Sequence, residues 1–243
     1  MKYKGILLAT AGGVIGMSGA QAADLPVKAA PMYTPAPATW TGFYAGIHLG
    51  ANWQMTSVSM TDPKGPYTGT FGKANGAGFI GGGQIGYNWQ MGTTVWGLEA
   101  TISGLTGSAN ASNTWYNSPS SGDTIHSSID WLATFRGRVG WLMNPDTLLY
   151  ATGGLAVGGV KNAANQYGLN DDPYYTARVS KTKTGYVVGG GMEHRLSRNW
   201  NIAVEGLYVD LGKSSAPWAG DNTKTTHFKN SAVIGQLKLN YKF

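Results

Sequence analysis

The 243-residue sequence contains no cysteine and few charged residues. The absence of cysteine excludes a disulfide-stapled scaffold. Charged residues make up 12% of the chain, about half of the roughly 25% that is usual for soluble domains. The formal net charge is +6, but the lysines and arginines are scattered, and without a basic cluster the sequence does not indicate nucleic-acid binding.

Glycine and aromatic residues are abundant instead. The chain has 37 glycines, nine tryptophans and 13 tyrosines, and this glycine content is about twice the roughly 7% that is usual. So many aromatic rings are not typical of a disordered chain. The sequence therefore predicts a folded protein with an unusual surface or interior.

The N-terminus resembles a secretory signal. Lys2 and Lys4 precede an apolar stretch over 5–17, and Ala20-Gln21-Ala22 then forms a small-x-small cleavage site. The apolar stretch is too short for a stable spanning helix, which needs about 20 residues. We expect residues 1–22 to be a signal peptide cleaved after Ala22. Since no cysteine follows the cleavage site, the product is not a lipoprotein.

Residues 23–39 hold four prolines among alanines and predict an extended periplasmic linker without a core. From Trp40 to the end, apolar and polar residues alternate, which is typical of two-faced strands. In the last strand Leu237 and Leu239 alternate with Lys238. Eight segments show this pattern: 40–54, 76–91, 93–105, 127–141, 147–160, 183–196, 199–212 and 233–243.

The connections between these segments alternate strictly in length. Short connections lie near 91–93, at 143–147 and at 196–199, whereas long ones cover about 55–75, 105–127, 161–182 and 213–230. All tight turns then lie at one end of an antiparallel meander. Long loops are uncommon in compact soluble domains but normal on the outer side of bacterial barrels. Residues 40–243 therefore predict an all-β fold, an eight-stranded antiparallel up-and-down transmembrane β-barrel with long outer loops and short periplasmic turns.

The apolar face is expected to meet lipid. Aromatic rings near strand ends form interfacial girdles in membrane barrels, and the candidates here are Trp53, Trp89, Trp96, Trp141, Trp200 and Tyr241. The opposite face, which is rich in glycine and includes Asp130 and Arg195, would line the lumen. Because every backbone group must be paired in lipid, 235–243 is predicted to close the sheet. A soluble lipocalin-like barrel, with the apolar face inside, is the alternative.

Six charged residues are predicted near mid-height on the inner face: Glu99, Arg136, Arg138, Glu193, Glu205 and Lys238. An eight-stranded barrel is only about wide enough for its side chains to fill it. Three acids and three bases in that space should form ion pairs that offset their desolvation and block the lumen. The alternative is that inward glycines leave room for water around each charge.

The quoted strands also carry a resemblance. ADLPVKAAP followed by WTGFYAGIHLG, and then VWGLEATISG, TFRGRVGW, LLYATGGLAVG, KTGYVVGGGMEHRLS and NWNIAVEGLYVDLG, are similar in order to the small alpha-proteobacterial outer-membrane proteins of the outer-membrane immunogenic protein/RopB family. The resemblance implies a surface-exposed structural protein of the cell outer membrane, a family also called porin-like. Its partners would be outer-membrane lipid and the barrel-insertion machinery, with Leu239, Tyr241 and Phe243 as the insertion signal.

Two motifs suggest chemistry that their context does not support. Residues 81–86 match G-x-G-x-x-G, but they fall inside a predicted strand rather than between a strand and a helix. His126 and Ser128, with Asp130 on the same predicted luminal face, resemble the His-x-Ser of outer-membrane lipid A deacylases. Side chains two residues apart rarely point at each other well enough for a nucleophile and its base. We predict no catalytic residue, metal site or cofactor.

Two functions remain open from the sequence. One is a structural outer-membrane barrel with a charged, mostly plugged lumen. The other is porin-like passage of small solutes, or binding of a ligand at the outer loops, such as the haem to which some members of the resembled family have been linked.

Overall fold

The computed structural model describes residues 39–61, 69–114, 122–167, 173–218 and 221–243. The signal peptide predicted at 1–22 and nearly all of the linker predicted at 23–39 lie outside these ranges, so both stay predictions. No helix within the described ranges is long and apolar enough to cross a membrane.

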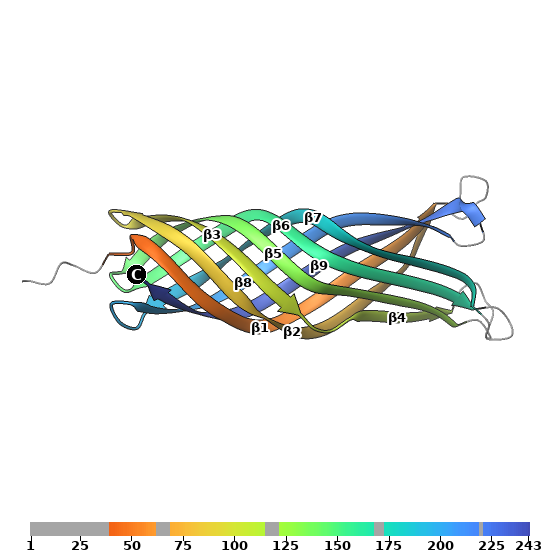
Figure 1. The fold of residues 1–243 in the computed structure, drawn as a ribbon, viewed down its shortest axis with the longest axis horizontal. Helices are drawn as coiled ribbons and strands as arrows, with labels where there is room; N and C mark the ends of the chain where they lie inside the picture. The colour runs from red at the N-terminus through yellow and green to blue at the C-terminus, as the bar shows by residue number, and fades with distance from the viewer. Residues whose placement is uncertain (1–38, 62–68, 115–121, 168–172, 219–220) are drawn as a thin grey trace, which may run out of the picture. The chain divides into compact units, whose positions relative to one another are not determined.

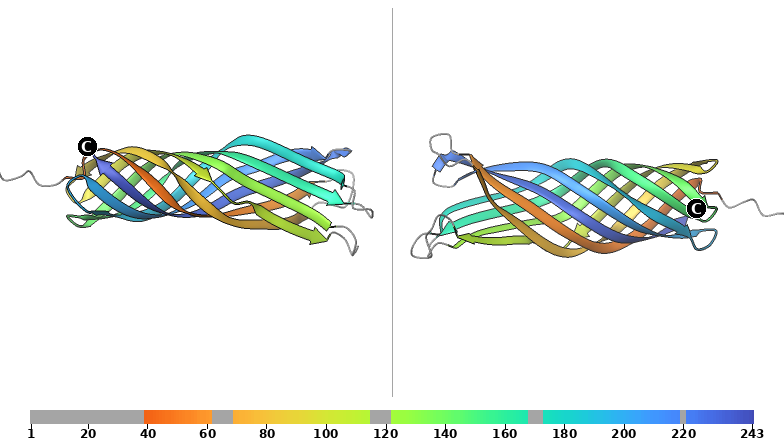
Figure 2. Two further views of the ribbon diagram at one scale, coloured as in Figure 1. Left: turned by 60° about the horizontal axis from the view of Figure 1, so that its bottom comes forward. Right: turned by 180° about the vertical axis from the view of Figure 1, so that it is seen from behind.

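The described residues form one closed antiparallel β-sheet (Figure 1). Neighbours in the chain pair along the sheet, and the first strand pairs with both the second and the last, which closes the ring. Figure 2 shows the same ring of tilted strands from two further sides. The strands are β1 (Gly42–Thr61), β2 (Gly69–Met91), β3 (Thr94–Leu105), β4 (Ala109–Thr114), β5 (Gly122–Asn144), β6 (Thr147–Tyr167), β7 (Pro173–Arg195), β8 (Trp200–Trp218) and β9 (Asp221–Lys242).

The nine strands occupy eight positions, because β3 and β4 share one. The third strand breaks at 106–108 and resumes as β4, which pairs with β5 and, at one residue, with β2. Gly107 lies at the break with a φ of 89°. A Cβ there would come 2.5 Å from the carbonyl oxygen of Ala77, so glycine alone fits this turn. The predicted eight-stranded meander is confirmed, with one interrupted strand.

The predicted long loops are wrong in extent. Paired strands run through most of 55–75, 105–127, 161–182 and 213–230, and β2, β5 and β7 each reach 23 residues. The reason is an interior that continues beyond the membrane. Val58, Ile125 and Phe228 point inward there and are buried together, so the strand extensions have a core to pack against.

Exposed aromatic side chains mark two levels on the outside of the ring. The level near the short turns contains Trp89, Trp96, Trp141, Trp200 and Tyr241. The other level contains Trp53, Phe79, Trp131 and Tyr186, with half-buried Tyr208 beside Tyr186, and we call these five residues the outer aromatic ring. From Phe43 to Trp53 the chain covers about 11 residues, the length that a tilted strand needs to cross a bilayer. The strand segments beyond the outer aromatic ring therefore lie outside the hydrocarbon core.

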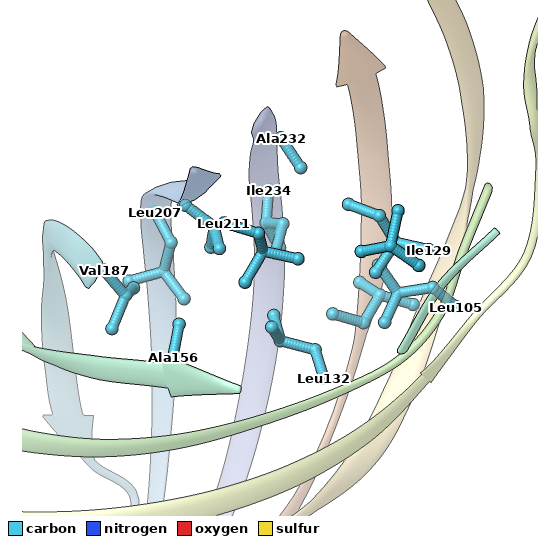
Figure 3. Close-up of a cluster of buried hydrophobic side chains, with 12 residues drawn as sticks. Leu105, Ile129, Leu132, Ala156, Val187, Leu207, Leu211, Ala232 and Ile234 are labelled. Carbon is cyan, nitrogen blue, oxygen red and sulfur yellow. The ribbon is translucent and has the colours of Figure 1, made fainter. Parts of the chain in front are cut away.

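The interior changes character along the barrel axis. At the short-turn end Trp40 packs against Val95, Leu148 and Tyr150. The charged side chains come next, and beyond them lies an apolar cluster of 12 residues (Figure 3). Its members are Ile80, Leu105, Ile129, Leu132, Ala156, Val160, Val187, Leu207, Val209, Leu211, Ala232 and Ile234.

A polar layer separates this cluster from the outermost apolar one. Asn230 donates hydrogen bonds to Thr56 at 3.1 Å and to Ser127 at 2.8 Å, and Ser127 donates to Asn162 at 2.6 Å. The prediction of a polar lumen is therefore correct only for part of its height. In β8 the change is visible in the sequence, since inward Asn201 and Glu205 are followed by inward Leu207 and Val209.

Single cysteines can test this arrangement, since the chain has none of its own. Asn75→Cys, beyond the outer aromatic ring, should react with a membrane-impermeant maleimide in intact cells. Ile85→Cys should not react, because its side chain faces the hydrocarbon core. Thr93→Cys, in a short turn, should react only after the outer membrane is opened, and its labelling in intact cells would mean that the barrel is inverted.

Deletion of Phe243 tests the predicted insertion signal. The Phe243 N–H donates to the Phe43 carbonyl oxygen at 3.0 Å, and its ring lies 5.2 Å from the Tyr241 ring. We expect the deletion to leave a secreted protein that inserts poorly, while Phe243→Trp, which keeps a terminal ring, inserts normally. Outer-membrane level and heat-dependent gel mobility measure this. Normal values for the deletion would show that the terminal ring is not part of the signal.

Candidate functional site

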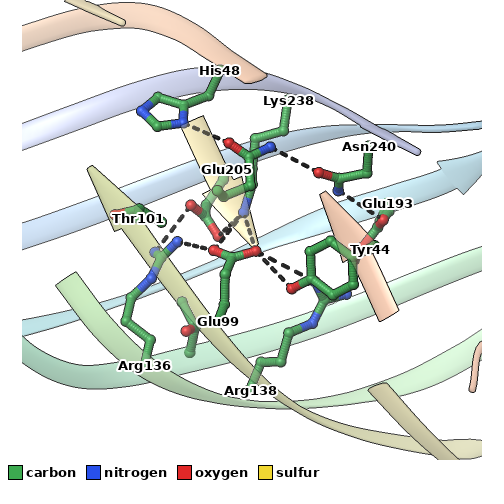
Figure 4. A network of polar contacts seen from close by, with 12 residues as sticks. Tyr44, His48, Glu99, Thr101, Arg136, Arg138, Glu193, Glu205, Lys238 and Asn240 are labelled. Carbon is green, nitrogen blue, oxygen red and sulfur yellow. Dashed lines mark hydrogen bonds and ion pairs between the residues drawn. The ribbon is translucent and has the colours of Figure 1, made fainter. Parts of the chain in front are cut away.

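The six predicted lumen charges meet inside the barrel (Figure 4). They come from five strands: Glu99 from β3, Arg136 and Arg138 from β5, Glu193 from β7, Glu205 from β8 and Lys238 from β9. Strand register accounts for this, because Glu99 is directly opposite Arg136 on the neighbouring strand. Each of these side chains occupies an inward position of the two-residue repeat. We call the six residues the charged cluster.

Two carboxylates and two cations form the centre of the charged cluster. Arg136 bonds Glu99 through one terminal nitrogen, and its other terminal nitrogen lies 3.0 Å from Glu205 Oε1. The Lys238 ammonium donates to both oxygens of Glu99 at 2.7 Å and lies 3.6 Å from Glu205 Oε2. Each charge at the centre thus contacts two of the opposite sign.

Arg138 and Glu193 form a second pair beside the centre. Arg138 donates to Glu193 Oε2 at 2.5 Å, whereas its nearest Glu99 oxygen is 3.9 Å away. Its guanidinium also lies 4.4 Å from the centre of the Tyr150 ring, a cation–π contact. Arg138 therefore has Glu193 as its hydrogen-bonded partner and Glu99 as a more distant one.

Neutral side chains complete the hydrogen bonding of the carboxylates, a role that the sequence pattern alone did not indicate. The Tyr44 and Tyr150 hydroxyls donate to Glu99 at 2.8 Å and to Glu205 at 2.9 Å. Glu193 accepts from Asn240 at 3.1 Å and from Asn201 at 3.3 Å. All these donors occupy inward positions, so strand parity was the signal that could have found them.

The charged cluster is almost completely removed from solvent. The exposed fraction of its six residues ranges from 1% to 4%. Inward glycines make room for it: a Cβ on Gly86 would lie 2.4 Å from the Tyr44 hydroxyl, and one on Gly191 2.8 Å from the Tyr150 hydroxyl. Such burial is costly for a charge without a partner. The geometry therefore corresponds to buried, paired charges, and separately solvated charges would need far more exposure.

The residues of the predicted insertion signal all lie on the outer surface. Leu239 and Tyr241 are exposed on the lipid-facing side of β9, and Phe243, which directly follows the strand, is exposed beside them. Tyr241 packs edge-on against Trp200, with 5.1 Å between ring centres. These positions agree with strand parity, but the role in insertion is a prediction.

The face predicted for His126, Ser128 and Asp130 is wrong. A bulge between Ile129 and Trp131 shifts the register, so Ile129 points inward and the three polar side chains point outward, beyond the outer aromatic ring.

The contacts of these three residues do not form a catalytic pair. Asp130 bonds the Lys161 ammonium at 2.6 Å, which lowers the pKa of Asp130. Ser128 donates to Asp130 at 2.9 Å, and His126 bonds Asn110 at 2.7 Å. Within the described residues no hydrogen bond joins His126 to Ser128. A nucleophile with its base, which hydrolysis requires, is therefore not assembled here.

The other motifs have structural positions. Gly81 to Gly86 lie within β2, where no helix follows to hold a phosphate. His48 is buried between Gln84 at 2.7 Å and Ser103 at 2.9 Å. Among the described residues, no group of three or more His, Asp or Glu side chains could hold a metal ion.

Replacement of Arg138 tests the pairing. Arg138→Met should lower the free energy of unfolding by about 3–5 kcal/mol, because Glu193 is left buried without its cation. Adding Glu193→Gln should restore a large part of this loss. Tryptophan fluorescence during denaturant unfolding from lipid vesicles measures both. Arg178→Met, at an exposed site on β7, is the matched control, and equal stability of the two single variants would contradict the pairing.

The comparisons with known proteins agree with this geometry. Residues 14–243 match the family described as outer membrane protein beta-barrel domain. A 31 kDa outer-membrane immunogenic protein of Brucella melitensis is 33% identical over 251 residues, which covers 99% of this chain and all of the relative. A 22 kDa outer membrane protein of Rhizobium leguminosarum is 34% identical over 46% of this chain and 47% of its own.

Among solved structures, the outer membrane protein OprG from Pseudomonas aeruginosa matches with a TM-score of 0.50 and 11% identity, over 85% of this chain and 99% of that one. At this identity the likeness concerns the fold alone. The resemblance inferred from the strand sequences is confirmed by the family match and the Brucella relative. This chain therefore belongs to the outer membrane protein beta-barrel family, and it is an outer-membrane protein.

Proposed function

We propose that the protein is a structural component of the outer membrane whose interior is sealed, so that it does not conduct solutes. The observation that carries the proposal is the charged cluster, in which six charges neutralise one another at exposures of 4% or less. A ring of eight strand positions is about filled by its own side chains. The described interior fits that expectation, since charged and apolar layers are stacked along it.

The order of these layers argues against passage of ions. An ion coming from the short-turn side would have to displace Lys238 or Arg136 from carboxylates that each cation already contacts. It would then meet the apolar cluster that contains Leu132, Leu207 and Ile234. Transfer of an isolated charge into apolar surroundings costs many kcal/mol, so the two layers act as barriers in series.

Porin-like passage would need a hydrated path through both layers, and ligand capture, such as haem at the outer loops, would involve loop tips outside the described residues. No contact among the described residues favours passage of solutes or capture of a ligand. The matched relatives are named as immunogenic or outer membrane proteins and not as enzymes, so no enzymatic role is proposed.

Planar-bilayer recording of the refolded protein tests the seal. The unmodified protein should show no steady conductance steps, and Arg138→Met should remain closed because the apolar layer is intact. The combination of Arg138→Met with Leu132→Ser and Leu207→Ser should leak, since it weakens both layers. Heat-dependent gel mobility confirms that each variant is folded before recording. Large, steady conductance steps from the unmodified protein would contradict the sealed barrel and support the porin-like function.

A further inference from the structure

The ring of strands is open at one seam beyond the outer aromatic ring. The β7–β8 ladder ends where Tyr186 pairs with Asp210. Above that point the described part of β7 pairs only with β6, and that of β8 only with β9. Gly212, with a φ of 70°, forms a bulge there, and its N–H donates to Asp210 Oδ1 at 2.8 Å. Figure 1 shows the outer ends of β7 and β8 apart.

Lysines line this seam from three strands. Lys213 from β8 and Lys229 from β9 lie on the outward face, whereas Lys181 and Lys183 from β7 share the inward side of that strand with buried Val187 and flank the opening. The Lys183 ammonium reaches across the opening and donates to the Lys213 carbonyl oxygen at 2.5 Å. Lys213 is directly opposite Lys229 in the β8–β9 ladder, an arrangement of like charges that destabilises a sheet when nothing neutralises it. We call these four residues the seam lysines.

The described residues around the four seam lysines supply one carboxylate, so the positive charge at the seam is only partly neutralised. Asp210 is the only described carboxylate in contact with them, and it bonds Lys229 at 3.1 Å. This hydrogen bond raises the pKa of Lys229, so the lysine stays charged. Lys181 and Lys213 are exposed and make no ion pair among the described residues. The contrast with the charged cluster, where acids and bases balance, indicates that the seam is built for an anion from outside the chain.

The height of the seam indicates which anion it meets. Tyr186 and Tyr208, which belong to the outer aromatic ring, lie directly below it with 6.3 Å between their ring centres. Tyrosine is enriched at the level of the lipid headgroups. Exposed Val188 continues this surface toward the hydrocarbon core. A ligand here would thus touch apolar surface with one part and lysines with the other.

We propose that the seam binds the phosphate-bearing headgroup of an outer-leaflet glycolipid. Its phosphates would contact Lys183, Lys213 and Lys229, and its acyl chains would lie along Tyr186 and Val188. Bound phosphate would offset the repulsion between Lys213 and Lys229 and hold β7 beside β8 where no ladder joins them. The same residues would select a phosphorylated lipid over one without phosphate.

Native mass spectrometry of the refolded protein in detergent tests the site. The ligands are bis-phosphorylated lipid A, its fully dephosphorylated form and inorganic phosphate. The unmodified protein should retain bis-phosphorylated lipid A at least tenfold more than the dephosphorylated form. The triple variant Lys183→Gln, Lys213→Gln, Lys229→Gln should lose that preference. Lys161→Gln, at a lysine on β6 that is paired with Asp130, is the matched control and should keep it.

Three outcomes would overturn the proposal. Equal retention of the phosphorylated and dephosphorylated lipids would show that phosphate is not recognised. An equal loss in Lys161→Gln and the triple variant would show that general surface charge, and not the seam, holds the lipid. Displacement of lipid A by inorganic phosphate at millimolar concentration would identify a free-anion site instead of a lipid site. Heat-dependent gel mobility shows whether the triple variant is folded, so that a loss of lipid binding by the folded variant can be attributed to the missing seam lysines.

Discussion

Neutralisation of charge in a space without bulk water is the constraint on which this structure depends. Glu99 and Glu205 accept bonds from Arg136 and Lys238, and these contacts join β3, β5, β8 and β9 across the lumen. A hydrogen-bonded ring of strands can in principle flatten or widen. The charged cluster joins opposite walls of the barrel and so fixes their separation. Gly86 and Gly191 leave the space that Tyr44 and Tyr150 occupy, which allows many large side chains to lie at one level of the barrel.

The same chain contains two opposite electrostatic designs. In the charged cluster each cation contacts a carboxylate, and each carboxylate contacts a cation. At the seam the lysines outnumber the carboxylate that they contact, and two of them are opposed in one ladder. The first arrangement stabilises the barrel without any partner. The second is costly for the isolated chain and would become favourable with a bound anion, which is the basis of the proposed lipid site.

Much of this could be predicted from the two-residue period. Alternation separated lipid-facing Leu237 and Leu239 from luminal Lys238, and it brought the six charges to one face before any register was known. The two-residue period could not give strand length, because beyond the membrane Val58 and Phe228 pack inward while the outward residues become polar, and the alternation of apolar and polar residues is then weaker.

The two-residue period also could not anticipate a bulge. Once the register slips between Ile129 and Trp131, every side chain on the outer part of β5 changes face, which is why Asp130 was assigned to the lumen. The pairing of Arg138 with Glu193 could not be predicted either, because it depends on how the closed ring brings β5 and β7 together across the lumen and not on the sequence around either residue.

The extension of the strands beyond the outer aromatic ring has a consequence for how such a surface could vary. About ten further residues per strand, at about 3.3 Å each and tilted in the ring, raise the described outer ends of the strands by roughly 20 Å or more above the headgroups. Because the faces alternate with a period of two, adding or removing two residues on each strand of a hairpin would lengthen or shorten this extension without turning its core outward. A single added residue would exchange the two faces unless a bulge absorbed it, as at Asp130. The height of the strand ends above the membrane can therefore change in steps of two residues per strand, without any change in the part embedded in the membrane.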